Sequence, residues 1–289
     1  MPEMEFPHVA VDGRLQSADG TELYWRGWLP EGSTRGVLVF VHGLAEHSGR
    51  YLNPVAHFVP LGYACYAVDL RGHGHSGGLR VHVDSFDDYL DDVSALLAEV
   101  RRRHPHPPAL VGHSMGGLVV LLFATGRGDA VAAVLASSPS LAAHPSARPS
   151  LPVRIIAGVL SRLVPRILIS SDLDPRAISR DPEVVRGYLE DPQVSSKASP
   201  RWYTSFLAAQ RRAFEGAPSL GIPALVMQSG DDRLVDPAAA ARWAEAAPRD
   251  LVTYIEWPGL FHEMFNEPQR RRVFEAMEPW LDRHLSGDP

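Results

Sequence analysis

The sequence predicts an α/β fold in which a mostly parallel β-sheet carries helices on both faces. Two observations lead to this fold class. Six short apolar runs lack the polar alternation of a half-exposed strand, which is typical of strands buried on both faces. Segments with helical periodicity lie between these runs, and a helix is the usual connection between parallel neighbours.

The chain opens with two strands that we expect to be antiparallel. Residues 9–15 and 23–28 are short strand-like runs. The segment SADGTE separates them, and its Asp19-Gly20 pair is typical of a hairpin turn. This hairpin would precede the parallel part of the sheet.

Strands and helical segments alternate over most of the remaining chain. The predicted buried strands are VLVFV (37–41), ACYAVDL (64–70), PALVG (108–112), VAAVLASS (131–138), PALVMQS (223–229) and LVTYIEW (251–257). The clearest helical pattern spans residues 85–103, where one side carries Phe86, Leu90, Val93, Leu96, Leu97 and Val100.

An insertion interrupts this alternation after the fourth of these strands. It holds helical patterns but no convincing strand, and it is too long to be a plain connection. One helix is predicted near residues 153–164, and another begins where Asp181 can cap and Pro182 suits the first helical position. The predicted domains are a first core part (1–138), a helical cap (139–221) and a second core part (222–289).

Composition and charge exclude several classes of function. The 28 Lys and Arg residues against 34 Asp and Glu residues give a formal net charge of -6, which provides no basic field for nucleic acid. The N-terminus lacks the basic start and apolar stretch of a signal peptide, and no segment is long enough to span a membrane. The single cysteine, Cys65, excludes an internal disulfide. We therefore expect a cytoplasmic protein.

A serine motif carries the clearest chemical signal. Gly112-His113-Ser114-Met115-Gly116 matches G-x-S-x-G, with a predicted strand before it and a predicted helix after it. A turn this tight holds the serine in strained backbone geometry and exposes its hydroxyl at the start of the helix. Ser114 is therefore the predicted nucleophile.

The serine needs a base and an acid that orients the base. In chain order, the loop after the strand at 223–229 offers Asp231, Asp232 and Asp236, and the loop after the last strand offers His262. His113 is the rival base, but a neighbour of the nucleophile on such a turn points away from it. The position of His262 between the last strand and the last helix favours it as the base.

The reaction also needs hydrogen-bond donors for a developing oxyanion. The backbone N–H groups of Met115, after the nucleophile, and Leu44, in the loop after the strand at 37–41, are the predicted donors. A metal site at His42 and His47 is conceivable, but no cluster with ligand spacing accompanies these two histidines. We expect no metal and no other cofactor.

Nearly the whole chain resembles the α/β-hydrolase superfamily and, within it, the monoacylglycerol lipases, which overlap with proteins described as lysophospholipases or serine-aminopeptidase-like hydrolases. The segments that carry the resemblance are HGLAEHSGRY (42–51), DLRGHGHSGG (69–78), GHSMGG (112–117), GDDRLVD (230–236) and PGLFHEMFNEP (258–268), with LDPRAISRDPEVVRGYLEDP (173–192) in the insertion. The resemblance implies an α/β-hydrolase fold with a mostly parallel eight-stranded sheet and a helical cap.

The resemblance also assigns roles to residues. It implies Ser114 as nucleophile, Asp232 as acid and His262 as base, with the N–H groups of Leu44 and Met115 as the oxyanion hole. Asp232 is chosen over Asp231 because Arg233-Leu234-Val235 follow it, as in the family pattern. The family often has glycine where this chain has Ala45.

The implied reaction is hydrolysis of monoacylglycerols to glycerol and free fatty acid through an acyl-enzyme. The same three residues would also serve a lysophospholipase, a short-chain carboxylesterase or a peptidase, and a binding protein without turnover is a further alternative. The expected partner is a monoacylglycerol or related single-chain lipid ester, and the sequence does not decide the oligomeric state.

The apolar stripe on the predicted cap helix has two interpretations. It consists of Ile156, Val159, Leu160, Leu163 and Val164. These residues could line an acyl channel and make transient contact with a membrane surface, or they could pack the cap onto the body, which is the interpretation that we slightly prefer.

Overall fold

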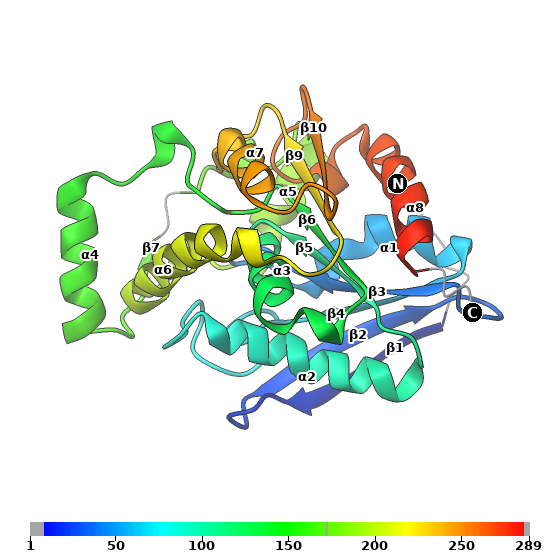
Figure 1. Ribbon diagram of the computed structural model, residues 1–289. Helices are drawn as coiled ribbons and strands as arrows, with labels where there is room; N and C mark the ends of the chain where they lie inside the picture. Colours follow the sequence, from blue (N-terminus) through cyan, green and yellow to red (C-terminus); the bar gives the residue numbers. More distant parts are fainter. Residues whose placement is uncertain (1–8, 171–172, 286–289) are drawn as a thin grey trace.

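The computed structural model describes residues 9–170 and 173–285, and it confirms the predicted fold class (Figure 1). One eight-stranded sheet has the strand order β1-β2-β4-β3-β5-β6-β9-β10. The strands are β1 (Val9–Gln16), β2 (Glu22–Leu29), β3 (Gly36–Val41), β4 (Tyr63–Val68), β5 (Ala109–His113), β6 (Ala133–Ser137), β9 (Ala224–Ser229) and β10 (Val252–Trp257). The pairs β1–β2 and β2–β4 are antiparallel, and the remaining neighbours are parallel.

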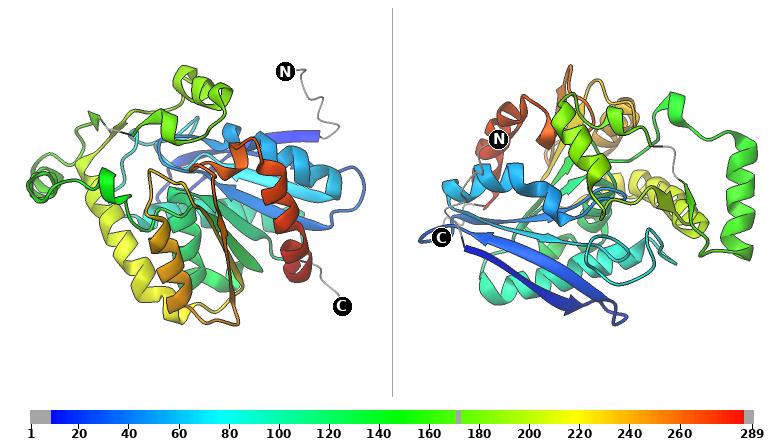
Figure 2. Two further views of the ribbon diagram at one scale, coloured as in Figure 1. Left: turned by 90° about the horizontal axis from the view of Figure 1, so that it is seen from above. Right: turned by 180° about the vertical axis from the view of Figure 1, so that it is seen from behind.

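Helices cover both faces of the sheet, because successive side chains of its central strands point to opposite faces. In β3, Val37, Val39 and Val41 belong to one buried cluster, and Leu38 and Phe40 belong to the other. The first cluster packs against α2 (Asp87–Arg103), α3 (Met115–Arg127), α6 (Pro200–Gly216) and α7 (Pro237–Ala246). The second packs against α1 (Leu52–Phe58) and α8 (Arg270–Leu285), and Figure 2 shows the two helical layers.

The inserted region contains two further helices, α4 (Leu151–Leu163) and α5 (Pro182–Glu190). Asp181 caps α5 as predicted, because its carboxylate accepts a hydrogen bond from the N–H of Glu183 at 3.0 Å. The expectation that this region has no strand is wrong. It contains one short antiparallel pair, β7 (Ile169–Ser170) and β8 (Lys197–Ala198), and two residues are too few to produce a periodic pattern.

The parts of the inserted region differ in how they contact the body. Figure 1 shows α4 standing apart from the sheet, with α6 between α4 and the body. On α6, Trp202, Ala209 and Ala213 are buried in the same cluster as α3. The limits of the cap at residues 139 and 221 stay a proposal. In this proposal, α6 is the helix that joins the cap to the body.

Short 3-10 helices occupy several of the connections. They are η1 (Ser48–Tyr51), η2 (Val59–Leu61), η3 (Gly128–Ala130), η4 (Pro145–Ala147), η5 (Pro175–Ala177), η6 (Ala217–Ser219) and η7 (Met264–Asn266). The single cysteine, Cys65 in β4, is fully buried, and burial raises the pKa of its thiol.

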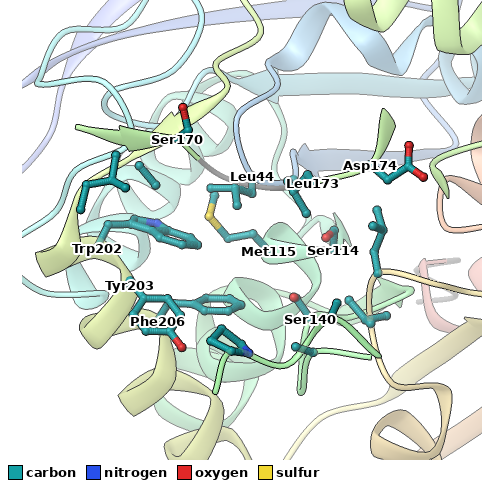
Figure 3. Close-up of a pocket in the computed structure, with 18 of the residues that line it drawn as sticks. Leu44, Ser114, Met115, Ser140, Ser170, Leu173, Asp174, Trp202, Tyr203 and Phe206 are labelled. Carbon is teal, nitrogen blue, oxygen red and sulfur yellow. The ribbon is translucent and has the colours of Figure 1, made fainter. Parts of the chain in front are cut away.

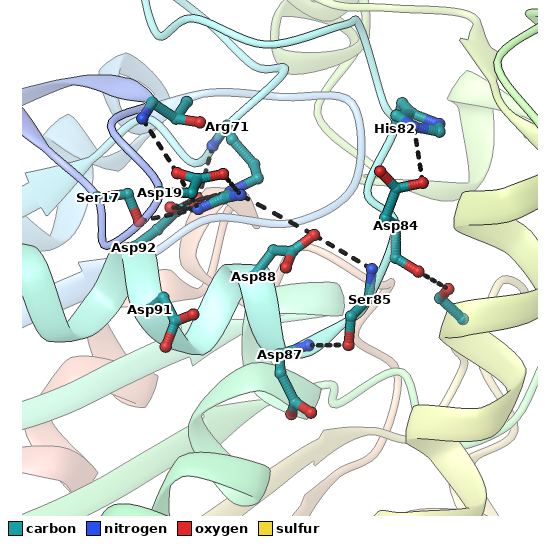
Figure 4. A network of polar contacts seen from close by, with 12 residues as sticks. Ser17, Asp19, Arg71, His82, Asp84, Ser85, Asp87, Asp88, Asp91 and Asp92 are labelled. Atoms are coloured by element: carbon teal, nitrogen blue, oxygen red, sulfur yellow. Dashed lines mark hydrogen bonds and ion pairs between the residues drawn. The ribbon is translucent and has the colours of Figure 1, made fainter.

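A buried arginine fixes the loop that follows β4. Arg71 donates to Asp92 on α2 through Nε at 3.0 Å and through Nη2 at 2.7 Å (Figure 4). It also donates to Ser17 and Asp19, which lie between β1 and β2. Asp92 is fully buried, so Arg71 supplies the positive charge that this carboxylate needs. One side chain thus joins the hairpin, the loop and α2.

The carboxyl ends of β3, β5, β9 and β10 reach the same edge of the sheet. The segments that follow these strands contain Leu44, Ser114, Asp232 and His262, respectively. In α/β sheets this edge is where ligands commonly bind.

Candidate active site

Ser114 occupies the sharp turn between β5 and α3. Its φ of 54° lies in the left-handed region, which costs a non-glycine residue about 1–3 kcal/mol. The two flanking glycines make the turn possible. A Cβ at Gly112 would overlap the carbonyl oxygen of Gly116, and a Cβ at Gly116 would overlap the carbonyl oxygen of Val41. The N–H of Ser114 donates to the carbonyl of Ser137 on β6 at 2.9 Å, which secures the turn to the sheet.

His262 links Ser114 to Asp232. The Nε2 atom of His262 lies 2.9 Å from Ser114 Oγ, and its Nδ1 atom lies 2.7 Å from Asp232 Oδ2. The second oxygen of Asp232 accepts from the N–H groups of Leu234 and Val235, at 2.9 and 3.0 Å. These bonds fix the carboxylate, which in turn fixes the imidazole with Nδ1–H donating and Nε2 facing the serine hydroxyl.

The other carboxylates and the rival histidine lie in different places. Asp236 caps α7 by accepting from the N–H of Ala238 at 3.1 Å. The backbone N–H of Asp231 donates to the carbonyl of Leu260 at 3.1 Å. The Nδ1 atom of His113 lies 3.4 Å from Ser137 Oγ, and burial lowers the pKa of His113 to about 3. The structure thus brings together Ser114, His262 and Asp232 from the residues that the sequence offered.

Charge and burial act in opposite directions on the two ionisable members of this group. Burial alone would lower the pKa of His262, but the charge of Asp232 and the hydrogen bond to it raise that pKa above its usual value. Burial alone would raise the pKa of Asp232, but the charge of His262 and hydrogen bonds lower it. The pair therefore favours an ionised aspartate and a histidine that readily accepts a proton.

Leu44 and Met115 both line the cavity beside Ser114 (Figure 3). Met115 is the first residue of α3, so its N–H has no acceptor within the helix. In the loop after β3, Glu46 accepts from the N–H of Gly43 at 2.5 Å. Ala45 has a φ of 64°, the left-handed geometry in which glycine is most favourable.

His42 supports the same loop, which the sequence did not reveal in detail. Its Nε2 accepts from the N–H of Leu70 at 2.9 Å, so its Nδ1–H donates to the carbonyl of Gly43 at 2.7 Å. Burial lowers the pKa of His42 to about 4, which keeps the ring neutral. His47 instead pairs with Asp191 at 2.8 Å. Within residues 9–170 and 173–285, no group of three His, Cys, Asp or Glu side chains could hold a metal ion.

A cavity of about 650 Å³ opens over Ser114 and His262. Figure 3 shows Trp202, Tyr203 and Phe206 of α6 on one of its sides, with Met115 between these rings and Ser114. The remaining walls are largely apolar and come from the loop after β6, α4, β7 and the segment between β7 and α5, and the loop before α7; they include Ala143, Ala147, Pro149, Val153, Ile156, Ala157, Leu160, Ile169, Leu173, Ile178, Leu234 and Val235.

The predicted cap stripe is divided between two environments. Ile156 and Leu160 line the cavity, whereas Val159, Leu163 and Val164 are not among its lining residues. Ile156 is 57% exposed and Leu163 is 74% exposed. Packing of the whole stripe onto the body, the interpretation that the sequence slightly favoured, is therefore wrong: a periodic pattern identifies an apolar side of a helix but not its neighbour. None of the helices in the described residues is long and apolar enough to cross a membrane.

A charged cluster that the sequence did not predict lies beside Ser114 and His262 at the cavity. Arg50 donates through Nε to Glu46 at 2.9 Å and through Nη2 to both oxygens of Glu263, at 2.9 and 2.7 Å. Its guanidinium lies over the ring of Tyr188 on α5, 4.8 Å from the ring centre. Arg50 and Glu263 are 213 residues apart in the chain, so no local pattern indicates that they meet.

The sequence of this chain is similar to those of several known proteins. Residues 32–269 match the family model described as serine aminopeptidase, S33. The monoacylglycerol lipase of Mycolicibacterium smegmatis is 35% identical over 268 residues, which are 92% of this chain and 95% of that protein. The phospholipase YtpA of Bacillus subtilis is 33% identical over 251 residues, 86% of this chain and 96% of that protein.

A solved structure extends the likeness to three dimensions. The monoacylglycerol lipase of Paleococcus ferrophilus matches with a TM-score of 0.82 and 34% identity, covering 91% of this chain and 99% of that one. The chain therefore belongs to the serine aminopeptidase S33 family and, within the α/β-hydrolase superfamily, to the monoacylglycerol lipase group of carboxylic ester hydrolases.

Proposed function

We propose that this serine hydrolase cleaves monoacylglycerols to glycerol and free fatty acid, with Ser114 as nucleophile, His262 as base and Asp232 as the acid that orients His262. The observation that carries the proposal is the hydrogen-bonded series from Ser114 Oγ through His262 to Asp232, which opens into a largely apolar cavity of about 650 Å³. A cavity of this size suits a single-chain lipid.

The proposed reaction has two halves. Ser114 Oγ attacks the ester carbonyl carbon while His262 Nε2 takes the hydroxyl proton, and His262 returns that proton to the departing glycerol oxygen. Water then attacks the acyl-enzyme, His262 takes a proton from the water, and the fatty acid leaves as Ser114 regains its hydrogen. In both halves the N–H groups of Leu44 and Met115 would stabilise the negative charge on the carbonyl oxygen.

The cap would receive the acyl chain. We assign Ile156 and Leu160 to the wall of the acyl channel, because both line the cavity. Val159, Leu163 and Val164 would instead face a lipid surface, because they are exposed on a helix that stands apart from the body. This arrangement would let a monoacylglycerol enter from a membrane surface through transient contact with α4.

A lysophospholipase with the same catalytic residues is the second candidate, favoured by the similarity to a bacterial phospholipase. The test is a hydrolysis panel with monoacylglycerols from short to long acyl chains, a lysophospholipid, a diacylglycerol and an aminoacyl amide. We expect the long-chain monoacylglycerols to be preferred. Hydrolysis confined to the amide would refute the lipase proposal.

The role of Ser114 has its own test. We expect Ser114→Ala to unfold at the same temperature as the parent chain while losing nearly all turnover, because no acyl-enzyme can form. An organophosphonate should label the parent chain at Ser114 and leave the variant unlabelled. Parent-like turnover in Ser114→Ala would contradict the assignment.

A further inference from the structure

The walls of the cavity carry negative charge without a matching positive one. Glu46, Asp174 and Glu263 line the cavity, and no lysine or arginine is among its described lining residues. The residues outside the described ranges, 1–8, 171–172 and 286–289, include no lysine or arginine in the sequence. A negatively charged substrate group would therefore find no lysine or arginine side chain at the cavity wall.

The arginine behind this wall is already paired with carboxylates. Arg50 donates to Glu46 and, with one nitrogen, to both oxygens of Glu263, and its side chain is only 10% exposed. Burial alone would lower the pKa of Arg50, but the charges of Glu263 and Glu46 raise it above its usual value. One guanidinium between two carboxylates leaves this buried cluster with one net negative charge.

The cluster adjoins the position where the ester would react. Glu46 accepts from the N–H of Gly43, the residue before Leu44, and Glu263 directly follows His262. The alcohol half of the ester must lie near His262, because His262 returns a proton to its oxygen in the proposed reaction. The cluster would therefore interact electrostatically with any charge on the alcohol half of the substrate.

We propose that the Glu46–Arg50–Glu263 cluster makes this chain selective for fatty-acyl esters of uncharged alcohols and discriminates against esters whose alcohol carries a phosphate. This inference rests on the proposed function, since it concerns the substrate of the same serine. Two like charges about 7 Å apart, at an effective dielectric constant of about 20, repel each other enough to lower binding by roughly tenfold to a hundredfold.

The test compares two esters that differ only in the phosphate: monooleoylglycerol and oleoylglycerol phosphate, both in the same neutral detergent micelles. We expect kcat/KM for monooleoylglycerol to be at least about tenfold higher with the parent chain. The preference should persist near 1 M salt, where the Debye length is about 3 Å, because buried charges are poorly screened. A preference that disappears with salt would assign the effect to the surface charge and overturn the inference.

The Glu263→Gln variant tests the cluster itself. It removes the net charge and keeps an oxygen that can accept from Arg50, so the preference for the uncharged ester should fall by about tenfold. A change in the pKa of His262 would affect both substrates alike and cancel in the ratio. The matched control is Glu245→Gln, which removes an exposed carboxylate of α7 and should leave the ratio unchanged. An unchanged ratio in Glu263→Gln would overturn the inference.

A second measurement uses the parent chain and therefore does not depend on the folding of a variant. The non-hydrolysable ether analogues of the two esters are compared as competitive inhibitors of a neutral chromogenic ester. The uncharged ether should inhibit at least about tenfold more strongly than its phosphate. Equal inhibition would refute the charge selectivity alone, whereas failure to hydrolyse any glycerol ester would refute the proposed function.

Discussion

At the scale of single residues, the turn at Ser114 depends on the two flanking glycines, which have no Cβ atom. Backbone carbonyl groups approach Gly112 and Gly116 so closely that a methyl group at either position would overlap them. The sequence revealed this requirement because the G-x-S-x-G spacing is local, with all of its members within five residues. The pattern could not reveal how the carbonyl of Val41, from another strand, approaches Gly116.

A methyl group at Gly116 should disrupt this turn. We expect Gly116→Ala to lower the free energy of unfolding by about 3 kcal/mol, because its Cβ would overlap backbone that cannot move freely. Gly126→Ala, near the end of the same helix, is the control. Its Cβ meets nothing within 4 Å, so it should stabilise the chain by about 0.5–1 kcal/mol. Urea unfolding of both variants measures the difference, and equal effects would contradict the steric explanation.

The pH dependence of turnover should report the pairing of His262 with Asp232. His262 must be neutral to accept a proton, and its pKa is raised, so kcat/KM should rise with pH through a midpoint above 6.5. In Asp232→Asn the charge is gone and burial remains, so the midpoint should move to lower pH while kcat falls about a thousandfold or more. Asp231→Asn is the control and should keep the parent profile. A midpoint that stays in place in Asp232→Asn would contradict this pairing.

At the scale of elements, long-range contacts decide what local patterns leave open. The eight strands of the main sheet and the helices expected at 85–103 and near 153–164 were predicted to within a few residues, because continuous apolar runs and helical spacing are local properties. The helices α1, α6 and α7 and the short pair β7–β8 were not located. The sequence alone offered three aspartates near His262, and only the fold shows which one reaches it. The sequence also could not predict which side of α4 faces outward or that Arg50 pairs with Glu263, because each depends on packing between distant segments.

The contact between Arg71 and Asp92 gives a prediction at this scale. Arg71→Ala should lower the free energy of unfolding by about 3–5 kcal/mol, because it leaves Asp92 buried without a counter-charge. Adding Asp92→Asn should recover part of that loss, since the uncharged amide is less costly to bury. Denaturant unfolding of the two single variants and the double variant measures the coupling.

An exposed ion pair provides the comparison for this cycle. Arg271 and Glu275 pair on the surface of α8, and Arg271→Ala should change the free energy of unfolding by less than about 1 kcal/mol. Simple additivity of the Arg71 and Asp92 substitutions would show that the two side chains do not depend on each other, contrary to their geometry.

At the scale of the whole molecule, the body and α4 present different surfaces. The sheet and its helices bury most of their large apolar side chains, while α4 leaves Leu151, Ile155 and Leu163 more than half exposed. Several exposed large apolar side chains on one helix are typical of a site for contact with lipid or protein. In this chain the same helix also contributes Ile156 and Leu160 to the cavity.

Vesicle binding tests the proposed contact of α4 with lipid. The double substitution Ile155→Ser and Leu163→Ser should weaken co-sedimentation with phosphatidylcholine vesicles, because each buried leucine or isoleucine side chain contributes about 1.5–3 kcal/mol. Turnover of a short-chain ester in solution should change little, because neither residue lines the cavity. Leu52→Ser, on α1, is the control. Unaltered vesicle binding by the double variant would exclude α4 as the lipid contact.

The burial of Cys65 has a practical consequence for following α4. Cys65 lies on β4 with its side chain buried, and it is the single cysteine of the sequence. A cysteine introduced at an exposed position such as Leu163 would therefore be the one readily accessible thiol, without any need to remove the native residue. A fluorescent or spin label attached there would report the environment of α4 in the free protein, in the complex with a substrate analogue and in the membrane-bound protein.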